Sequence, residues 1–597
     1  MSGKLQEKYQ QLHGRYASVH QKIKKRLNLM ALWRLVTFLA GAYISYRIIV
    51  ISLVPGLLTA VLVLSLFFYL IVLFNRGKHK QALTRNLMQV NAGEIEALRG
   101  HVKNFADGHE FDDPSHAFAS DLELFGEQSL FQHINRTSTY AGKNQLASWL
   151  LNPLQQEQEI TARQQAIREL KGLLTWRQRF TATGYLLNSE SYQDARLIAW
   201  SKEEPVIGKN LFFRVFRWVL PVLTLALIIL FFQGTLPLGY LLMVLVINVL
   251  VLYRVNKRVT SQHNQVTRQI EILRNYSLLF HHIERQSFQS PALQSLKARF
   301  FSNHEPASRS IRKLSRILDA LDNRISPILG QILNLVFLWD IHQVIRLENW
   351  HKRHAPDVEQ WIHSLGRFDA FISLANFAYN HEDFYFPEVD PSVVLHTEGM
   401  GHPLIPAPKR VDNPLTIREK GVSLIITGAN MAGKSTFLRT IGVNLVLAMA
   451  GSVVCARHMT FRLTRLFTSM NITDSLSRNE SYFYAEIKRL RQLTEHALHH
   501  QHLLVLLDEI LTGTNTKDKE KASKAFVNRL LKMKVTSVIA THDLSLTTMA
   551  EEHPDSIRNT RFEVGLEDGR MKFDYKLRVG VAQNMNALAL LREMGLI

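Results

Sequence analysis

Two long apolar stretches dominate the hydrophobic pattern of the first half of the chain. Residues 35–74 contain one charged side chain, Arg47, and residues 218–253 contain none. A single helix over the first stretch would be about 60 Å long, which is about twice the hydrocarbon thickness of a bilayer. Each stretch is therefore predicted to fold back on itself, the first at Pro55-Gly56 and the second at "QGTLPLG".

Basic residues crowd the outer ends of both predicted hairpins, whereas neither tight turn contains lysine or arginine. This asymmetry predicts four membrane-crossing helices in a bacterial-type cell membrane, with both chain termini and all large segments in the cytoplasm. Arg47 is expected to extend toward the outer interface or to face a partner helix. The alternative is a pair of buried core hairpins in a soluble protein, but uniformly apolar helices flanked by basic clusters are uncommon there. The flanking residues are Lys22, Lys24, Lys25, Arg26, Arg34, Arg76, Lys78, Lys80, Lys209, Arg214, Arg217, Arg254, Lys257 and Arg258.

Helical periodicity dominates the segments at 80–210 and 254–385. In "LASWLLNPL", for example, Leu146, Trp149 and Leu150 recur at intervals of three and four residues. Strand signals are scarce in these segments, and the sequence contains no tandem repeat and no zinc-ligand spacing. Glycine, proline and β-branched runs become frequent after about residue 390, so the sequence predicts a domain boundary near "YFPEVDPS".

The predicted architecture is multidomain, with transmembrane α-hairpins, an all-α lever and core domain, and a C-terminal α/β domain. A net charge of +20, from 71 lysines and arginines against 51 acidic residues, indicates an anionic partner, either nucleic acid or anionic lipid. The only cysteine, Cys455, excludes a disulfide framework and is predicted to be buried. The predicted bounds are 1–34 for a basic N-terminal segment, 35–75 for hairpin 1, 76–210 and 255–390 for the two parts of the helical domain, 211–254 for hairpin 2, and 391–597 for the α/β domain.

A phosphate-binding loop is predicted at "TGANMAGKST". The pattern G-x-x-x-x-G-K-[ST] runs from Gly428 to Ser435, between the strand-like "SLIITG" and the helical "STFLRTIGVNLVLAM". In this context the glycines let backbone N–H groups approach phosphate oxygens, Lys434 supplies charge to the β- and γ-phosphates, and the Ser435 hydroxyl can bind Mg²⁺. The predicted nucleotide-binding residues are Gly428, Ala429, Asn430, Met431, Ala432, Gly433, Lys434, Ser435 and Thr436.

Two further apolar strands end in residues suited to phosphoryl transfer. In "LLVLLDEI", Asp508 suits the Mg²⁺ shell and Glu509 suits activation of a water molecule toward the γ-phosphate. "TSVIATHDLSL" places His542 at a strand end, where it can reach the γ-phosphate or the attacking water, although a structural histidine is the alternative. The sequence therefore predicts an ATPase that uses ATP and Mg²⁺. Lys434, Glu509 and His542 are its catalytic residues, and Ser435 and Asp508 are its metal ligands.

Taken together, these motifs resemble those of the MutS family, the DNA mismatch repair ATPases of the ABC-type branch. The P-loop is similar to the family's TGPNMGGKST, with Ala429 and Ala432 in place of proline and glycine. "DEILTGTNTKD" is similar to DEIGRGTST-x-D, and "ATHD" to the family's histidine switch. "NESYFYAEI" resembles RSTFMVEM, which implies that Ser481 reaches the γ-phosphate of the opposing subunit in a homodimer with two composite ATP sites.

The resemblance extends beyond the ATPase but not to the whole family architecture. "TYAGKNQLASWLLNPL" resembles the entry helix of the family's core domain, and "FDAFISLANFAY" resembles the helix that leads back to the ATPase. A basic segment and an apolar hairpin replace the mismatch-reading domain with its Phe-x-Glu wedge. Phe125-Gly126-Glu127 has the same letters but lies at the start of the core-like helices, and we interpret it as a coincidence. Neither the DNA clamp nor the C-terminal dimerisation tail is recognisable.

The sequence therefore predicts a membrane-anchored, homodimeric MutS-like ATPase. By resemblance, its ATP cycle is coupled to binding of double-stranded DNA, in mismatch repair or DNA damage sensing. The alternative is a membrane-bound regulatory or mechanochemical ATPase without a DNA ligand, whose basic residues serve topology and membrane lipid. A transport ATPase is a weaker hypothesis, because short helices with almost no polar residues offer no substrate path.

Overall fold

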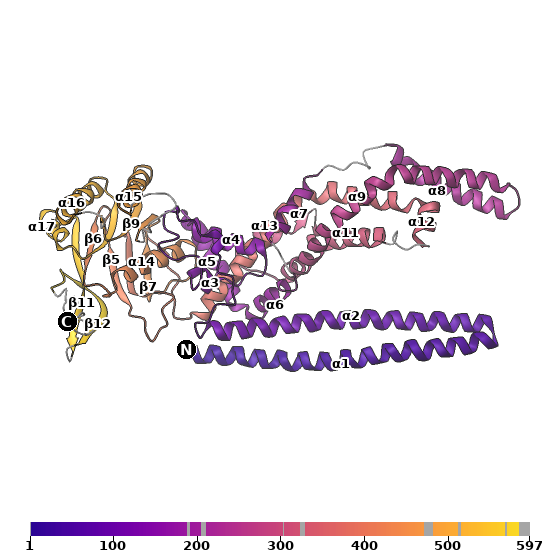
Figure 1. Ribbon diagram of the computed structural model, residues 1–597, viewed down its shortest axis with the longest axis horizontal. Coiled ribbons are helices and arrows are strands. Elements are labelled where there is room, and N and C mark those ends of the chain that lie inside the picture. The colour runs from indigo at the N-terminus through magenta and orange to yellow at the C-terminus, as the bar shows by residue number, and fades with distance from the viewer. Residues whose placement is uncertain are drawn as a thin grey trace. The chain divides into compact units, whose positions relative to one another are not determined.

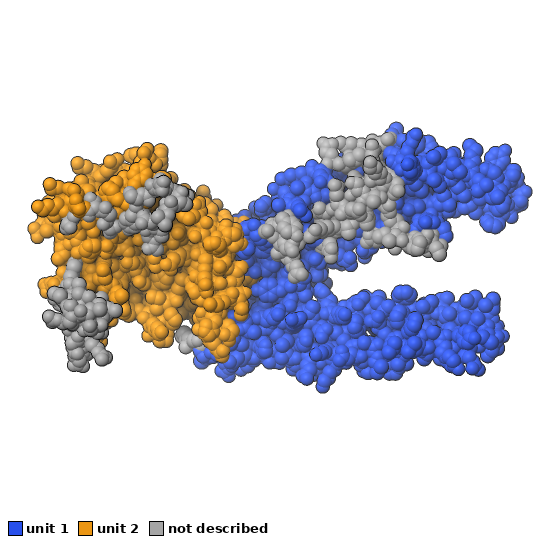
Figure 2. Space-filling view, in the orientation of Figure 1, with its two compact units in different colours: residues 1–95, 137–144, 173–370 blue, residues 96–136, 145–172, 371–597 orange. Residues whose placement is uncertain are grey.

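The chain divides into two compact units, each assembled from segments far apart in the sequence (Figure 2). Unit 1 comprises residues 1–95, 137–144 and 173–370, and unit 2 comprises residues 96–136, 145–172 and 371–597. This division differs from the predicted boundary near residue 390, because three segments upstream of it group with the α/β part. The computed structural model describes residues 2–187, 191–203, 211–302, 304–322, 329–470, 482–511, 515–567 and 570–583.

Unit 1 begins with a hairpin of two long helices, α1 (Ser2–Ile51) and α2 (Leu53–Ala97) (Figure 1). The chain folds back between these two helices, but the predicted turn at Pro55-Gly56 is wrong, since the break between the helices falls at Ser52. Proline is tolerated in the first turn of a helix, where its missing N–H would have no partner within the helix. The basic N-terminal segment is not separate either, because α1 runs through it without interruption.

Glycines allow α1 and α2 to approach each other closely. A Cβ atom placed on Gly41 would lie 2.3 Å from a methyl carbon of Val63, and one placed on Gly77 would lie 2.6 Å from a methyl carbon of Leu27. Small residues at a helix interface permit this close approach of the two backbones and so allow tight packing between the helices. At Gly41 and Gly77, the two helices pack this closely because glycine has no side chain.

Among the residues that the structure describes, three helices are long and apolar enough to cross a membrane: α1 from Gly3, α2, and α8 (Leu211–Phe232). A shorter apolar stretch, Leu238–Arg254, opens α9 (Leu238–Arg285), and α8 and α9 are separated at "QGTLPLG" as predicted. The Arg47 guanidinium donates a 3.4 Å hydrogen bond to the Tyr43 hydroxyl of its own helix. The membrane crossing itself stays a prediction from length, composition and flanking charge.

The remainder of unit 1 is also helical, as the periodicity predicted. The only strands described between residues 80 and 385 are the two-residue pair β1 and β2. Helices α4 and α13 each contribute residues to both units. The elements are α4 (Tyr140–Leu151), α6 (Leu174–Gly184), α7 (Ser191–Ser201), α10 (Pro291–Ala298), β1 (Phe301–Ser302), β2 (Glu305–Pro306), α11 (Ala307–Asp322), α12 (Leu329–Phe337) and α13 (Trp339–Asn380).

A buried carboxyl group on α13 organises the start of α4. Asp369 is fully buried and accepts hydrogen bonds from the backbone N–H of Ser138 at 2.9 Å and of Thr139 at 2.8 Å. The Thr139 hydroxyl donates a third, at 2.7 Å. Gly142 lies against the same carboxyl, where a Cβ would come within 2.4 Å of its oxygen. Burial raises the pKa of Asp369 to about 7, against the hydrogen bonds from Thr139 and Ser138 that lower it.

Asp369→Ala is expected to lower the free energy of unfolding by about 3 kcal/mol or more, because buried donors that lose their acceptor cost about 1–3 kcal/mol each. The folded-state pKa of Asp369 lies above its ordinary value of 3.8. Its contribution to stability is therefore largest below about pH 4 and is lost as the pH rises toward 7. Thermal and denaturant unfolding in detergent across this range measures both effects, and Asp369→Asn should remove the pH dependence.

Glu359→Ala provides the matched control, since Glu359 lies on the same helix with 43% of its side chain exposed. Its unfolding free energy should stay within about 0.5 kcal/mol of the wild type. An Asp369→Ala variant as stable as this control would contradict the capping role of Asp369.

Unit 2 is built on a six-stranded sheet in the order β12-β11-β6-β10-β9-β8. Five strands run parallel, and β12 pairs antiparallel with β11 at one edge. A second, four-stranded sheet has the order β3-β7-β4-β5. The strands are β3 (Glu388–Val389), β4 (Leu395–Met400), β5 (Asn413–Ile417), β6 (Ser423–Thr427), β7 (His458–Phe461), β8 (Arg465–Ser469), β9 (Leu503–Asp508), β10 (Thr536–Thr541), β11 (Ile557–Glu567) and β12 (Arg570–Val579).

Helices cover both faces of the large sheet (Figure 1). Along β9, Val505 and Leu507 belong to the core formed with α15 and α16, whereas Leu506 approaches Gly442 of α14. Successive side chains of a strand point to opposite faces, so α14 covers the face opposite to α15 and α16. The helices of unit 2 are η1 (His109–Phe111), α3 (Leu130–Ile134), α5 (Glu157–Gly172), α14 (Lys434–Met449), α15 (Tyr482–His499), α16 (Thr516–Lys532), η4 (Leu544–Leu546) and α17 (Met549–Glu552).

Candidate nucleotide-binding site

The register of the three central strands brings the predicted site residues to one edge of the sheet. Thr541 at the end of β10 pairs with Thr427 at the end of β6, and Ala540 pairs with Asp508 at the end of β9. The P-loop, Glu509 and His542 therefore all leave the sheet at its carboxyl edge. This is the edge at which α/β sheets bind their ligands.

The P-loop requires glycine at two positions. Gly428 has φ 155° and Gly433 has φ 101°, and a Cβ on Gly428 would lie 2.8 Å from the Phe562 carbonyl oxygen. Met431 adopts φ 69° in the middle of the loop. Helix α14 starts at Lys434, directly after Gly433, so its first backbone N–H groups are available to an anion at the helix N-terminus.

The Lys434 ammonium lies inside the loop. Its Nζ donates to the carbonyl oxygens of Gly428 at 2.8 Å and of Ala429 at 3.1 Å, and only 5% of the residue is exposed. Burial lowers the pKa of Lys434, while the nearby carboxylates of Glu509 and Asp508 act in the opposite direction. The loop carbonyls thus fix the position of a single positive charge at the helix N-terminus.

Ser435 and Asp508 form the predicted metal-binding pair. The Ser435 hydroxyl donates a hydrogen bond to the Asp508 carboxylate; burial raises the pKa of that carboxyl, and the hydrogen bond opposes the increase. Oxygen ligands of this kind suit Mg²⁺, which is usually bound by one or two protein ligands together with phosphates and water. Within the described ranges, no group of three His, Cys, Asp or Glu residues could hold a metal without such help. The pair therefore fits Mg²⁺ that is shared with a bound nucleotide.

Glu509 and His542 are in direct contact. The Glu509 Oε1 lies 2.9 Å from the His542 Nδ1, and 28% and 48% of the two side chains are exposed. Glu509 adopts φ 50°, and its backbone N–H donates to the Ala540 carbonyl at 2.9 Å. A non-glycine residue held in this conformation costs energy that the surrounding structure must supply, and such residues cluster at functional sites. The turn after β9 thus directs the Glu509 carboxylate toward His542.

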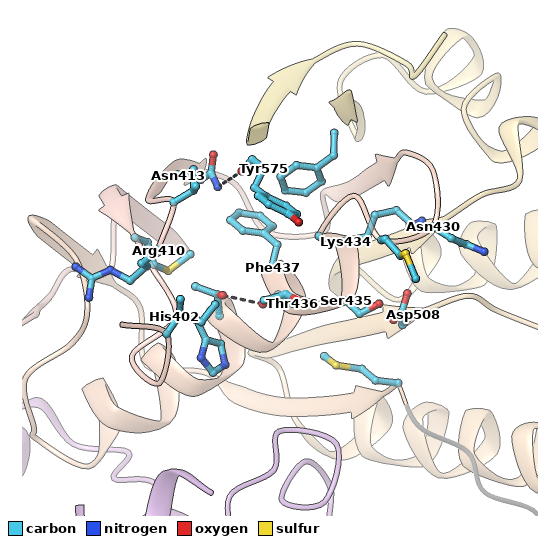
Figure 3. Close-up of a pocket in the computed structure, with 18 of the residues that line it drawn as sticks. His402, Arg410, Asn413, Asn430, Lys434, Ser435, Thr436, Phe437, Asp508 and Tyr575 are labelled. Atoms are coloured by element: carbon cyan, nitrogen blue, oxygen red, sulfur yellow. Dashed lines mark hydrogen bonds between the residues drawn. The ribbon is translucent and has the colours of Figure 1, made fainter. Parts of the chain in front are cut away.

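Lys434, Ser435, Asp508 and Glu509 line a cavity of about 790 Å³, a size typical of small-molecule sites, and His542 is not part of its lining. Lys434, Ser435 and Asp508 gather at one end, and His402 and Arg410 lie at the other (Figure 3). The aromatic rings of Phe437, Phe562 and Tyr575 also line the cavity, and the first two lie 5.7 Å apart. The cavity therefore combines a charged end suited to phosphates with apolar surface suited to a nucleoside.

Sequence reasoning missed Tyr575 and Asn413. Tyr575 has φ 53° at an irregularity of the β11–β12 pairing, and its ring would lie 3.1 Å from a Cβ on Gly433. The Asn413 amide donates to the Tyr575 carbonyl at 2.9 Å and accepts from the Leu577 N–H at 2.8 Å. Nothing in the sequence around either residue indicated this contact, since they are far apart along the chain.

A buried carboxylate connects α15 with the turn that follows β9. Glu486 is 2% exposed and accepts a hydrogen bond from the backbone N–H of Leu511, which has φ 59°. Glu486 lies within the "NESYFYAEI" stretch, but the sequence gives no indication of this contact with the turn after β9. Ser481, predicted to act on the opposing subunit, lies outside the described residues, and its role stays a prediction.

Two smaller predictions concern residues outside the cavity. Cys455 is buried as predicted, and burial raises the pKa of its thiol to about 12. Phe125 is 7% exposed and packs against Phe111 and Phe131, with ring centroids 5.8 and 5.4 Å away. Phe125 is therefore a core residue of unit 2 and is not presented to a nucleic-acid base.

Comparison with known families gives two matches. Residues 424–596 match MutS domain V, and residues 118–375 match MutS domain III. The chain belongs to the MutS family. The domain V match contains every predicted nucleotide-binding residue, and the domain III match contains α8 and the apolar start of α9. Residues 1–117, with the α1–α2 hairpin, lie outside both matches.

Individual MutS-family relatives align with only part of the chain. "DNA mismatch repair protein MutS 2" of Halobacterium salinarum is 31% identical over 236 residues, which cover 39% of this chain and 27% of the relative. "Endonuclease MutS2" of Thermus thermophilus is 33% identical over 196 residues, 33% of this chain and 25% of the relative. Human "MutS protein homolog 4" is 30% identical over 233 residues, 37% of this chain and 24% of the relative. The chain thus spans about a quarter of the length of these three relatives.

Proposed function

We propose that this protein is a membrane-anchored MutS-family ATPase that couples ATP hydrolysis to the binding of double-stranded DNA. The observation that carries the ATPase proposal is that Lys434, Ser435, Asp508 and Glu509 line one cavity at the carboxyl edge of the parallel sheet, where His542 contacts Glu509. Each side chain has the chemistry that one part of phosphoryl transfer needs. The two MutS matches support a DNA-related role for the cycle.

The proposed hydrolysis follows from the positions of these groups. The loop N–H groups and the Lys434 ammonium bind the β- and γ-phosphates and neutralise charge in the transition state. The Glu509 carboxylate orients a water molecule and accepts its proton as the water oxygen bonds to the γ-phosphorus and the bond to the β-phosphate oxygen breaks. His542 holds Glu509 in place. Mg²⁺, bound by Ser435 and Asp508, would supply further charge neutralisation on the phosphate oxygens.

A homodimer with two composite sites is part of the proposal. Ser481 immediately precedes α15 (Tyr482–His499), in the stretch that resembles the family segment reaching the opposing subunit. The hydrogen bond between Leu511 and Glu486 connects this helix with the turn beyond Glu509. A Ser481 that reaches the γ-phosphate of the opposing subunit would therefore be joined, through α15, to the hydrolytic turn of its own subunit.

A regulatory or mechanochemical ATPase at the membrane, without a DNA ligand, is the second candidate. It is favoured by the basic clusters at the ends of the two apolar hairpins, which account for part of the +20 charge through topology and anionic lipid. The first candidate is favoured by relatives whose names describe mismatch repair. The two candidates share the ATP site and differ in whether nucleic acid is bound.

The test uses the full chain in lipid nanodiscs. ATP hydrolysis is measured with and without Mg²⁺, and fluorescence anisotropy of a labelled DNA duplex is measured over a range of salt concentrations with and without ATP. We expect Mg²⁺-dependent hydrolysis and a duplex affinity whose logarithm falls linearly with the logarithm of salt concentration. Absence of hydrolysis would overturn the ATPase proposal. Hydrolysis without duplex binding at low salt would favour the DNA-free candidate.

A further inference from the structure

A second basic cavity lies in unit 1, far from the nucleotide site in the sequence. It has a volume of about 520 Å³ and is lined by the end of α9, the β1–β2 pair and α11, and we call it the α11 cleft. Five lysine or arginine side chains face it, one from α9 and four from α11. These five are Arg285, Arg309, Arg312, Lys313 and Arg316.

The four basic residues of α11 occupy one face of the helix because of their spacing. Relative to Arg309, the others lie three, four and seven positions further on, which is the spacing of neighbours on a helix surface. The opposite face is apolar, with Ile311, Leu314 and Leu321 each fully buried. Burying this apolar stripe within unit 1 therefore exposes the basic face to the cleft.

The positive charge of the cleft is only partly compensated. The Glu284 carboxylate accepts hydrogen bonds from the N–H group, at 2.9 Å, and the hydroxyl of Ser308. Glu305 lies 2.7 Å from the Lys313 ammonium. For Arg285, Arg312 and Arg316, no carboxylate partner occurs among the residues that the structure describes. Three guanidinium groups of the cleft are thus available to an external anion.

Phe301 adds an aromatic surface to this charge. It lines the same cleft from β1 and keeps 40% of its surface exposed. Exposed aromatic rings inside a basic groove are the combination that binds single-stranded nucleic acid, because bases stack on the rings while cations contact the phosphates. A duplex offers such a ring no free base face, whereas an unpaired base does.

Distance along α9 argues against lipid as the ligand. The apolar part of α9 ends near Arg254, and His281, which lines the cleft, lies 27 residues further along the same helix. At about 1.5 Å per residue, this corresponds to about 40 Å of helix. A helix that crosses a bilayer carries its continuation away from the surface, and at physiological salt charges are screened over about 8 Å. Headgroups at the end of the apolar segment are therefore too far from the cleft.

We propose that the α11 cleft binds a single-stranded segment of nucleic acid, with phosphates on Arg285, Arg312 and Arg316 and a base on Phe301. The inference rests on the DNA coupling proposed above and gives it a specific contact surface on the helical unit. A locally opened duplex or a single-stranded gap would present the required unpaired base next to a charged backbone. The cleft would then distinguish opened DNA from intact duplex.

The experiment measures binding of labelled oligothymidine and of a duplex to the full chain in nanodiscs, by anisotropy over a range of salt concentrations. Arg312→Ala/Arg316→Ala should weaken oligothymidine binding at least tenfold at low salt. The slope of the logarithm of affinity against the logarithm of salt concentration should also become shallower by about 1.4, because each lost phosphate contact changes it by about 0.7. Phe301→Ala should weaken binding about tenfold without changing the slope, since it removes stacking and no charge.

Lys352→Ala/Arg353→Ala is the matched control, because it removes the same charge from exposed positions of α13 in the same unit. Its affinity should stay within about twofold of the wild type, and ATP hydrolysis without nucleic acid should be unchanged in all variants. If the cleft variants bind oligothymidine as the control does, the inference is wrong and the proposed function stands. If the wild type binds duplex but not oligothymidine, the single-strand proposal is also wrong. Binding of neither probe would overturn both the inference and the DNA coupling.

Discussion

Glu509→Gln is expected to reduce the rate of ATP hydrolysis by about 10²- to 10⁴-fold while ATP still binds, because it removes the general base and keeps the shape of the side chain. The amide cannot accept the proton of the attacking water. The P-loop, Lys434 and the Ser435–Asp508 pair stay unchanged, so the phosphates keep their ligands. The variant should therefore accumulate bound ATP, which a filter-binding assay and a steady-state phosphate-release assay measure separately.

Two further variants make this expectation specific. His542→Ala removes the partner that holds Glu509 at 2.9 Å, and it should give a smaller loss of rate than Glu509→Gln because the base itself remains. Glu563→Gln serves as the control, since its carboxylate pairs with Arg578 and Arg561 on the same sheet and does not line the cavity. A Glu509→Gln variant that hydrolyses ATP at a rate near that of Glu563→Gln would assign the base to another residue.

The elements around the nucleotide could be predicted because each rests on a local and strong signal. β6, β9 and β10 are buried strands, and in the sequence each is an apolar run that is followed directly by residues of the site. The P-loop glycines were predicted from spacing, and their φ values and the 2.8 Å approach of Phe562 to Gly428 explain why other residues do not fit. Parallel pairing then brings the strand ends together, so fold and site follow from one pattern.

Contacts between distant segments could not be predicted from any local pattern. The amide of Asn413 holds the backbone of Tyr575, and the carboxyl of Asp369 binds the backbone before α4, at separations of 162 and 230 residues. A single asparagine or aspartate in a sequence has many equally plausible roles. The helix break at Ser52 was missed for a different reason, since Pro55-Gly56 is a strong turn signal that the first turn of α2 also tolerates.

The division into units follows the same logic. Hydrophobic periodicity predicts helices over residues 80–210, although residues 98–129 contain no helix besides η1, and it carries no information on which core the segments at 96–136 and 145–172 join. Tertiary contacts decide this. The Asp121 carboxylate accepts a 2.7 Å hydrogen bond from Thr468 of β8, and the Arg163 guanidinium donates to the Ala450 carbonyl at 3.0 Å. Both segments thereby become part of the unit that contains the nucleotide site.

Lys434→Met is expected to weaken ATP binding by about 100-fold or more and to abolish measurable hydrolysis. Hydrogen bonds to charged groups contribute about 1.5–3 kcal/mol each, and the Lys434 ammonium would bind two phosphates. Since about 1.4 kcal/mol corresponds to a factor of ten in affinity, losing both contacts weakens binding by about 100-fold or more. Methionine has a similar length and keeps the packing of a residue that is only 5% exposed. Isothermal titration calorimetry with a non-hydrolysable ATP analogue measures the affinity without interference from turnover.

The carbonyl contacts of Lys434 give the experiment a second readout. Nζ donates to Gly428 and Ala429, so the substitution also leaves two loop carbonyls without this donor and should lower the melting temperature modestly in the absence of nucleotide. Lys420→Met is the control, because Lys420 is exposed and precedes β6 at the opposite edge of the sheet. A purely structural Lys434 would lower the melting temperature and leave ATP affinity near that of Lys420→Met. Loss of a phosphate ligand should lower the ATP affinity far more than the stability, and this is the result that the buried charge at the start of α14 predicts.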